Sequence, residues 1–174
     1  MANMQISGSV SGMHGVFKDM NDAINASIEA QKKVCTMTLD QREQIISLIR
    51  KKTHENAEIL ANMGVNETGM GNVGDKILKH HLTADKVPGT EDISTIAWSG
   101  DRGLTLVEMG PFGVIGAITP ATNPSETVIC NCIGMLAGGN TVVFNPHPNA
   151  KKTTIYTINM INEASIEAGG PDNI

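Results

Sequence analysis

The pattern of apolar and polar residues divides the chain into a helical first half and a mixed second half. Up to about residue 87, apolar residues recur every three or four positions, which is the spacing of one face of an α-helix. The first such series is Phe17, Met20, Ile24, Ile28 and Val34. Residues 38–41, Thr-Leu-Asp-Gln, form a capping-box pattern and predict the start of a second helix, with an apolar stripe over residues 45–49. A further helix is expected around residues 59–63, and a fourth from about residue 73 to residue 81.

The second half consists of short apolar runs separated by glycine and proline. Residues 104–108 alternate like a half-exposed strand, whereas residues 114–118 and 141–144 are continuous apolar runs, typical of parallel strands buried on both faces. Helices are predicted over residues 124–137 and 151–168, because each apolar periodicity there ends in a glycine pair. This order predicts an α/β fold in which a helical N-terminal part precedes the first part of a Rossmann-like parallel sheet.

Three regions are therefore expected along the chain. They are a disordered N-terminus (residues 1–15), a helical part (16–87) and the first βαβα part of a dinucleotide-binding domain (88–174), which begins near the Pro88-Gly89 turn signal. Two crossover strands make a thin, incomplete sheet, so we infer that the chain is a piece of something longer.

Composition and charge exclude several classes of protein. The chain is 40% hydrophobic and 18% charged, as in a soluble globular protein. Its net charge of −5, without a basic stripe, argues against binding to nucleic acid. Neither a membrane-spanning segment nor a signal peptide is indicated. Three cysteines without zinc-type spacing fit a reducing compartment, so a cytoplasmic location is expected.

A rigid turn, residues 119–126, lies between the first continuous apolar run and the helix that follows it, and includes the start of that helix. We call this segment the elbow. Pro120 stops the strand, Asn123 is placed as the helix N-cap, Pro124 takes the first helical position, and Glu126 takes the third. A simple capped helix start explains most of this pattern. In addition, an asparagine that caps through its side-chain oxygen keeps its NH₂ group free to donate to a ligand, and such a donor can stabilise developing negative charge.

A second stiff tip, residues 145–148, follows the next strand. It reads Asn-Pro-His-Pro, and it is either a plain turn or one side of a ligand cleft shared with the elbow. The position of the tip favours a cleft, because ligands of parallel α/β sheets bind at the carboxyl ends of the strands.

Several longer motifs resemble those of one enzyme family. Residues 110–127, 133–140 and 142–148 are similar to the CoA-acylating aldehyde dehydrogenases, which are the propionaldehyde and acetaldehyde dehydrogenases of diol and ethanolamine degradation. Shorter matches occur upstream at 40–43, 67–71, 88–92 and 98–101. The resemblance extends from about Val16 to the last residue and implies an aldehyde dehydrogenase-like fold.

This resemblance implies a reaction and assigns roles to residues. Members oxidise a short-chain aldehyde with NAD through a cysteine thiohemiacetal, and then transfer the acyl group from the thioester to coenzyme A. Asn123 matches the asparagine that donates to the thiohemiacetal oxyanion. Thr119, Pro120, Ala121 and Thr122 would lie along the nicotinamide side of NAD. The residues expected beside its adenosine end are Asn145, Pro146, His147 and Pro148.

The chain also departs from the family pattern. Two residues separate Pro120 from Asn123, where ordinary members read Pro-Trp-Asn. Asn145 and Pro148 stand where ordinary members carry the lysine and glutamate that hold the adenosine ribose, which suggests looser adenosine binding and easier exchange of NAD for CoA. The family nucleophile lies in a downstream catalytic domain that this chain lacks. Cys35, Cys130 and Cys132 are expected to be buried and inert, and the adjacent residues His80 and His81 are not expected to bind metal.

The expected function is therefore that of a parent CoA-acylating enzyme, and the segment alone should be inactive. A non-catalytic binding or assembly module that retains half of the fold, or a related acyl-phosphate reductase, are the alternatives. The family implies a homo-oligomer and, for some members, the lumen of a bacterial microcompartment with contacts to its shell. Residues 1–12 lack a helical apolar stripe, so we predict that they do not target the protein there.

Overall fold

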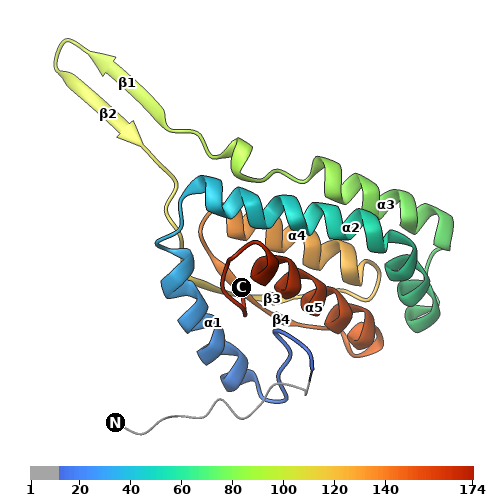
Figure 1. Ribbon diagram of the computed structural model, residues 1–174. Coiled ribbons are helices and arrows are strands. Elements are labelled where there is room, and N and C mark those ends of the chain that lie inside the picture. Colours follow the sequence, from blue (N-terminus) through green and yellow to red (C-terminus); the bar gives the residue numbers. More distant parts are fainter. Residues whose placement is uncertain (1–11) are drawn as a thin grey trace, which may run out of the picture.

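The computed structural model describes residues 12–174, which form a layer of helices on a small parallel sheet, with one hairpin projecting from it (Figure 1). The helices are α1 (Met20–Val34), α2 (Leu39–Thr68), α3 (Val73–Lys86), α4 (Pro124–Ala137) and α5 (Lys151–Glu167), with short 3₁₀ turns at Thr90–Asp92 and Pro148–Ala150. The strands are β1 (Ile96–Gly100), β2 (Gly103–Val107), β3 (Val114–Ile118) and β4 (Thr141–Asn145). The α/β class is confirmed.

The capping box predicted at residues 38–41 is present and starts α2. The Thr38 hydroxyl accepts from the Gln41 N–H at 3.2 Å, and the Gln41 side chain accepts from the Thr38 N–H at 2.9 Å. The helix then continues for 30 residues to Gly69, whose left-handed backbone (φ 69°) ends it. A separate helix around residues 59–63 was therefore a wrong prediction, because no glycine or proline interrupts residues 50–58.

The core lies between helices rather than inside the sheet. One face of α2 packs against α3, α4 and α5, and its side chains Ile45, Ile46, Ile49 and Leu60 are fully buried. They meet Ile129 and Ile133 of α4 and Met160 and Ile161 of α5 in one cluster. Burying an aliphatic side chain of this size contributes about 1.5–3 kcal/mol, so this contact holds the first half of the chain on the second.

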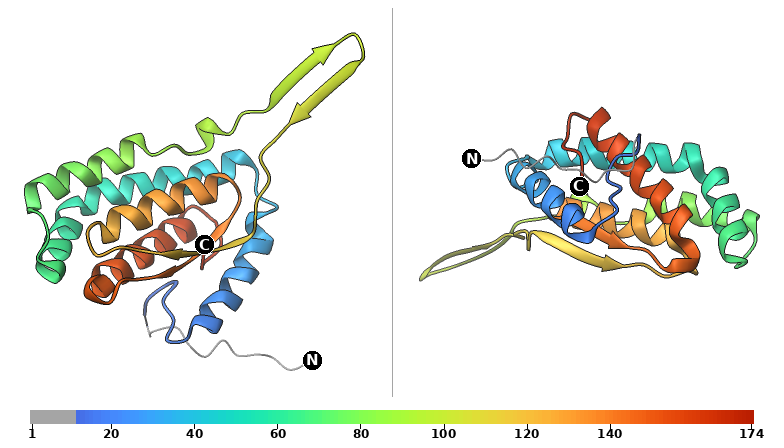
Figure 2. Two further views of the ribbon diagram at one scale, coloured as in Figure 1. Left: turned by 180° about the vertical axis from the view of Figure 1, so that it is seen from behind. Right: turned by 90° about the horizontal axis from the view of Figure 1, so that it is seen from below.

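The two continuous apolar runs form a parallel pair, as expected. Val114 pairs with Thr141 and Ile118 with Asn145, and α4 is the crossover between the strands. Burial on both faces was a wrong expectation, however. The helices lie to one side of β3 (Figure 2), and Ile118 is 85% exposed. Among the described residues, no helix covers the other face of this strand.

The alternating residues 104–108 belong to a hairpin that was only half predicted. β2 pairs with β1 in antiparallel register, from Ile96 with Val107 to Gly100 with Gly103. Figure 1 shows the hairpin extending away from the helices, and every residue in it is exposed. The alternating Ile96 and Trp98, followed by the Gly100–Gly103 turn, were the available signal for the missed strand.

Disorder was expected over residues 1–15. This expectation is wrong for His14 and Gly15, which contact α5. The His14 N–H donates to Asn159 Oδ1 at 2.7 Å, and Gly15 packs so closely on Asn162 that a β-carbon there would clash. Residues 1–11, including most of the segment predicted not to act as a targeting signal, lie outside the described residues.

Candidate functional site

The two proline-stiffened tips lie side by side at the carboxyl edge of the parallel pair. Ile118 pairs with Asn145, and immediately beyond it the Thr119 N–H donates to the Asn145 carbonyl at 3.2 Å. Each tip then turns into a helix, because Pro124 opens α4 and Pro148 opens the short 3₁₀ turn before α5. The sheet therefore brings together the two segments that the sequence marked as candidate sites.

Asn123 precedes α4, as predicted, but its side chain does not cap the helix. Its Oδ1 accepts instead from the Nζ of Lys79, at 2.8 Å, and no cap hydrogen bond forms. Lys79 lies on α3, which packs against α4. An ammonium group is a stronger donor than a backbone N–H, so the tertiary partner replaces the local one. Among the described residues, the Nδ2 of Asn123 donates one hydrogen bond, to the Thr122 hydroxyl at 3.3 Å.

Glu126 was predicted to complete the cap, and this too is wrong. Its carboxylate is buried and forms an ion pair with the Nζ of Lys76, with an N–O distance of 3.4 Å. The same Nζ donates to the Thr122 carbonyl at 3.0 Å. Both side chains are only 5% exposed, so each charge depends on the other for its stabilisation.

His80 completes the contact between α3 and the elbow. Burial lowers the pKa of its ring, although the nearby Glu126 carboxylate opposes that effect. The ring is therefore neutral near pH 7: Nδ1–H donates to the Lys76 carbonyl at 2.6 Å, and Nε2 accepts from the Ser125 hydroxyl at 2.7 Å. His81 contacts His54 instead. Within residues 12–174 no group of three His, Cys, Asp or Glu side chains is placed to hold a metal ion.

The remaining residues of the elbow differ in their exposure. Thr119 is 2% exposed, and its hydroxyl oxygen has no hydrogen-bond partner among the described residues. Ala121 is buried, whereas Pro120 and Thr122 are exposed at the tip. A buried hydroxyl without a partner is unfavourable, so the Thr119 hydroxyl is the exception among the polar groups of the elbow.

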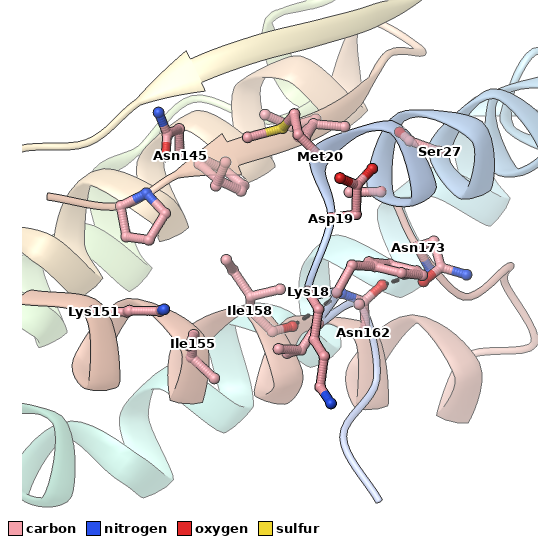
Figure 3. Close-up of a pocket in the computed structure, with 18 of the residues that line it drawn as sticks. Lys18, Asp19, Met20, Ser27, Asn145, Lys151, Ile155, Ile158, Asn162 and Asn173 are labelled. Atoms are coloured by element: carbon pink, nitrogen blue, oxygen red, sulfur yellow. Dashed lines mark hydrogen bonds between the residues drawn. The ribbon is translucent and has the colours of Figure 1, made fainter. Parts of the chain in front are cut away.

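A cavity of about 460 Å³ adjoins the second tip (Figure 3). Asn145, Pro146 and Pro148 line it together with the edge of β4 that β3 does not pair, the segment 15–20 and one side of α5. His147 is not in the lining, and its ring accepts from the Asn149 N–H at 3.1 Å within the turn. No residue of the elbow lines this cavity, so the described residues place the tips side by side without one shared cavity.

Comparison with known proteins identifies the family. The model of the aldehyde dehydrogenase family matches residues 8–173. The chain belongs to the aldehyde dehydrogenase family.

The similar proteins include members of the CoA-acylating subgroup of this family. The chain is 74% identical to a propionaldehyde dehydrogenase from the Clostridium phytofermentans fucose utilisation bacterial microcompartment, with a TM-score of 0.90 over 92% of this chain and 37% of that one. It is 50% identical to an acetylating acetaldehyde dehydrogenase of Bilophila wadsworthia, over 97% of this chain and 34% of that protein.

A third relative has been solved with coenzyme A. It is a propionaldehyde dehydrogenase of Rhodopseudomonas palustris with bound CoA and an acylated cysteine, 46% identical, with a TM-score of 0.88 over 91% of this chain and 37% of that one. The chain thus spans about a third of the length of the relatives it matches.

Two of the three cysteines are poor nucleophiles because they are wholly or partly buried. Burial raises the pKa of the Cys132 thiol to about 12, and burial also raises that of Cys130. Cys35 is exposed, so the expectation that all three are buried is wrong for it. Its sulfur accepts from Gln31 Nε2 at 3.0 Å, and it lies after α1, far along the chain from the elbow.

No helix among residues 12–174 is long and apolar enough to cross a membrane.

Three residues of α3 that hold the elbow were not predicted as part of the site. Lys76, Lys79 and His80 are spaced i, i+3 and i+4, which places them on one helix face. That spacing was visible in the sequence, but nothing local indicated that this face would meet a segment more than 40 residues away, where Lys79 reaches Asn123 across 44 positions.

Proposed function

We propose that the chain supplies the oxyanion donor and part of the dinucleotide site of a CoA-acylating, NAD-dependent aldehyde dehydrogenase. The observation that carries this proposal is the state of the Asn123 amide. Its oxygen is occupied by Lys79 at 2.8 Å, while its NH₂ group has one long contact at the exposed tip. With its oxygen turned toward Lys79, the amide presents its NH₂ group at the tip, and a donor is what the stabilisation of an oxyanion requires.

In the proposed reaction, a cysteine thiolate from another part of the enzyme adds to the carbonyl carbon of a short-chain aldehyde. A carbon–sulfur bond forms, and the carbonyl electron pair moves to the oxygen. Asn123 donates to this oxygen while it is negatively charged. When the carbonyl re-forms, the carbon loses a hydride and becomes a thioester carbon. The thiol of coenzyme A then takes the acyl group and releases the cysteine.

NAD would supply the hydride acceptor when bound. Thr119, with Pro120, Ala121 and Thr122, would line its nicotinamide side, and the buried Thr119 hydroxyl without a partner is consistent with this. Residues 145–148 would lie along its adenosine end, which they would hold without a charged side chain from Asn145 or Pro148. An engineered glycolyl-CoA reductase that is 44% identical to this chain has been solved with bound NADP⁺, and this supports a dinucleotide site on this fold.

The same proposal includes a homo-oligomer in the cytoplasm or in the lumen of a microcompartment. The hairpin β1–β2 presents Trp98, Leu104 and Leu106 to solvent, and an isolated two-stranded hairpin gains little stability by itself. A second copy of the enzyme covering these side chains would remove them from water. The microcompartment origin of a 74% identical relative supports the location, where the shell would be a further partner.

The test is formation of acyl-CoA from aldehyde, NAD and CoA by the complete enzyme that carries this chain. We expect Asn123→Ala to lower kcat by roughly 10²-fold, the loss of one oxyanion donor. The free energy of unfolding should change little, because the Asn123 side chain makes no cap hydrogen bond to α4. The segment alone should show no turnover. A complete enzyme that forms acyl phosphate from orthophosphate, or one without aldehyde oxidation, would contradict the proposal.

A further inference from the structure

The elbow around Asn123 is held at three successive points by one face of α3. The buried Nζ of Lys76 donates to the Thr122 carbonyl at 3.0 Å, and the buried ring of His80 accepts from the Ser125 hydroxyl at 2.7 Å. Between these two anchors, Lys79 donates to Asn123 Oδ1 at 2.8 Å. The outer contacts hold the positions on either side of Asn123, whereas the contact of Lys79 acts on the amide itself.

The chemistry of the two groups decides how the amide is oriented. An ammonium group has three donors and no acceptor, so only the oxygen of the Asn123 amide can face it. The NH₂ group must then point away from α3, toward the side where Thr122 is exposed, and among the described residues it donates only to the Thr122 hydroxyl, at 3.3 Å. Without a donor-only partner, nothing in these contacts would stop the amide from presenting its oxygen instead.

We propose that Lys79 is a positioning residue for the oxidation step: its ammonium keeps the Asn123 oxygen turned toward α3, so that only the NH₂ group can face the substrate oxygen. This inference rests on the proposed function. The positive charge on Lys79 also polarises the amide, which makes its N–H groups better donors to an oxyanion.

Lys79 is well suited to a test because its side chain is exposed, unlike that of Lys76 or His80. Removing its ammonium leaves no buried charge and keeps both outer anchors of the elbow. A substitution here therefore alters the amide without unfolding α3 or α4. Lys86, in the last turn of the same helix and also exposed, provides matched controls.

The experiment compares variants of the complete enzyme in steady-state oxidation of aldehyde by NAD and CoA. We expect Lys79→Met to lower kcat by about tenfold with an unchanged KM for aldehyde, less than the roughly 10²-fold loss of the whole donor in Asn123→Ala. Lys79→Glu should lower kcat more than Lys79→Met does. A carboxylate can accept from the NH₂ group of Asn123, and the amide oxygen then turns toward the substrate. Lys79→Arg should retain most activity. Lys86→Met and Lys86→Glu should match wild type.

Double substitution separates this inference from the function on which it rests. Adding Lys79→Met to Asn123→Ala should cause no further loss of kcat, because Lys79 acts through the amide. If Asn123→Ala lowers kcat but Lys79→Met and Lys79→Glu do not, the role of Lys79 is refuted and the oxyanion role stands. If Asn123→Ala has no effect, both are refuted. Equal losses in the single Lys79 variants and on the Asn123→Ala background would also overturn the inference, since Lys79 would then act independently.

Discussion

Replacing Lys76 with methionine tests whether the ion pair beneath the elbow is as buried as the structure shows. Lys76→Met keeps much of the side-chain volume but removes the ammonium from a Glu126 carboxylate that is 5% exposed. Breaking a buried pair from one side costs about 3–5 kcal/mol, because the remaining charge loses its partner without regaining water. The Thr122 carbonyl loses its donor as well.

Hydrogen–deuterium exchange of the complete enzyme can measure this loss where it occurs. Exchange through local opening depends on the opening free energy, so the expected cost should speed exchange in α3 and α4 peptides by roughly 10²-fold to several thousandfold. Peptides of the β1–β2 hairpin should not change, since the hairpin extends away from the helices that carry the pair (Figure 1). Lys86→Met, on the exposed end of α3, should leave all of these rates unaltered.

A second substitution determines whether the loss of stability comes from the Glu126 carboxylate that is left without its partner. In Lys76→Met/Glu126→Met both charges are gone, and exchange should return to within about tenfold of wild type, the remainder being the Thr122 carbonyl without its donor. If Lys76→Met alone changes exchange by less than about threefold, the pair is solvated in solution and our account of the elbow is wrong. A double variant as unstable as the single one would attribute the loss to packing instead of charge.

Three further predictions concern other parts of the chain. Burial raises the pKa of Glu67, but the N–H groups of Lys152 and Thr153 outweigh this and leave it lowered; Glu67→Gln should therefore destabilise the start of α5 near pH 7. Glu67 contributes above its unfolded pKa of about 4.3 and loses that contribution as the pH falls through its lower folded pKa, so denaturation midpoints of wild type and variant should converge in acid. Asn145→Lys should tighten NAD and weaken CoA in steady-state kinetics, and unchanged constants would exclude looser adenosine binding as its role. Residues 1–16 fused to a fluorescent protein should stay diffuse, whereas co-localisation with microcompartment shells would contradict the prediction.

The sequence by itself determined the secondary structure from β3 to α5, residues 114–167. The bounds predicted for β3 and α4 agree with the structure, and those for β4 and α5 agree within one residue. These elements are delimited by glycine and proline, whose effects on the backbone act within a few residues and are therefore legible in the sequence. The capping box of α2 is equally local, because both of its hydrogen bonds join Thr38 and Gln41.

Only the tertiary structure decided what the polar side chains of the site do. Local rules assigned the Asn123 oxygen and the Glu126 carboxylate to the helix that they start. In the fold, α3 packs against α2 and α4, and its buried face, which is mostly polar, brings Lys79 and Lys76 within reach of both groups. A charged donor then replaces a backbone N–H as the partner, because its hydrogen bond is the stronger of the two. Which partner a polar side chain takes is thus set by the packing of helices distant in sequence, and no local pattern specifies that packing.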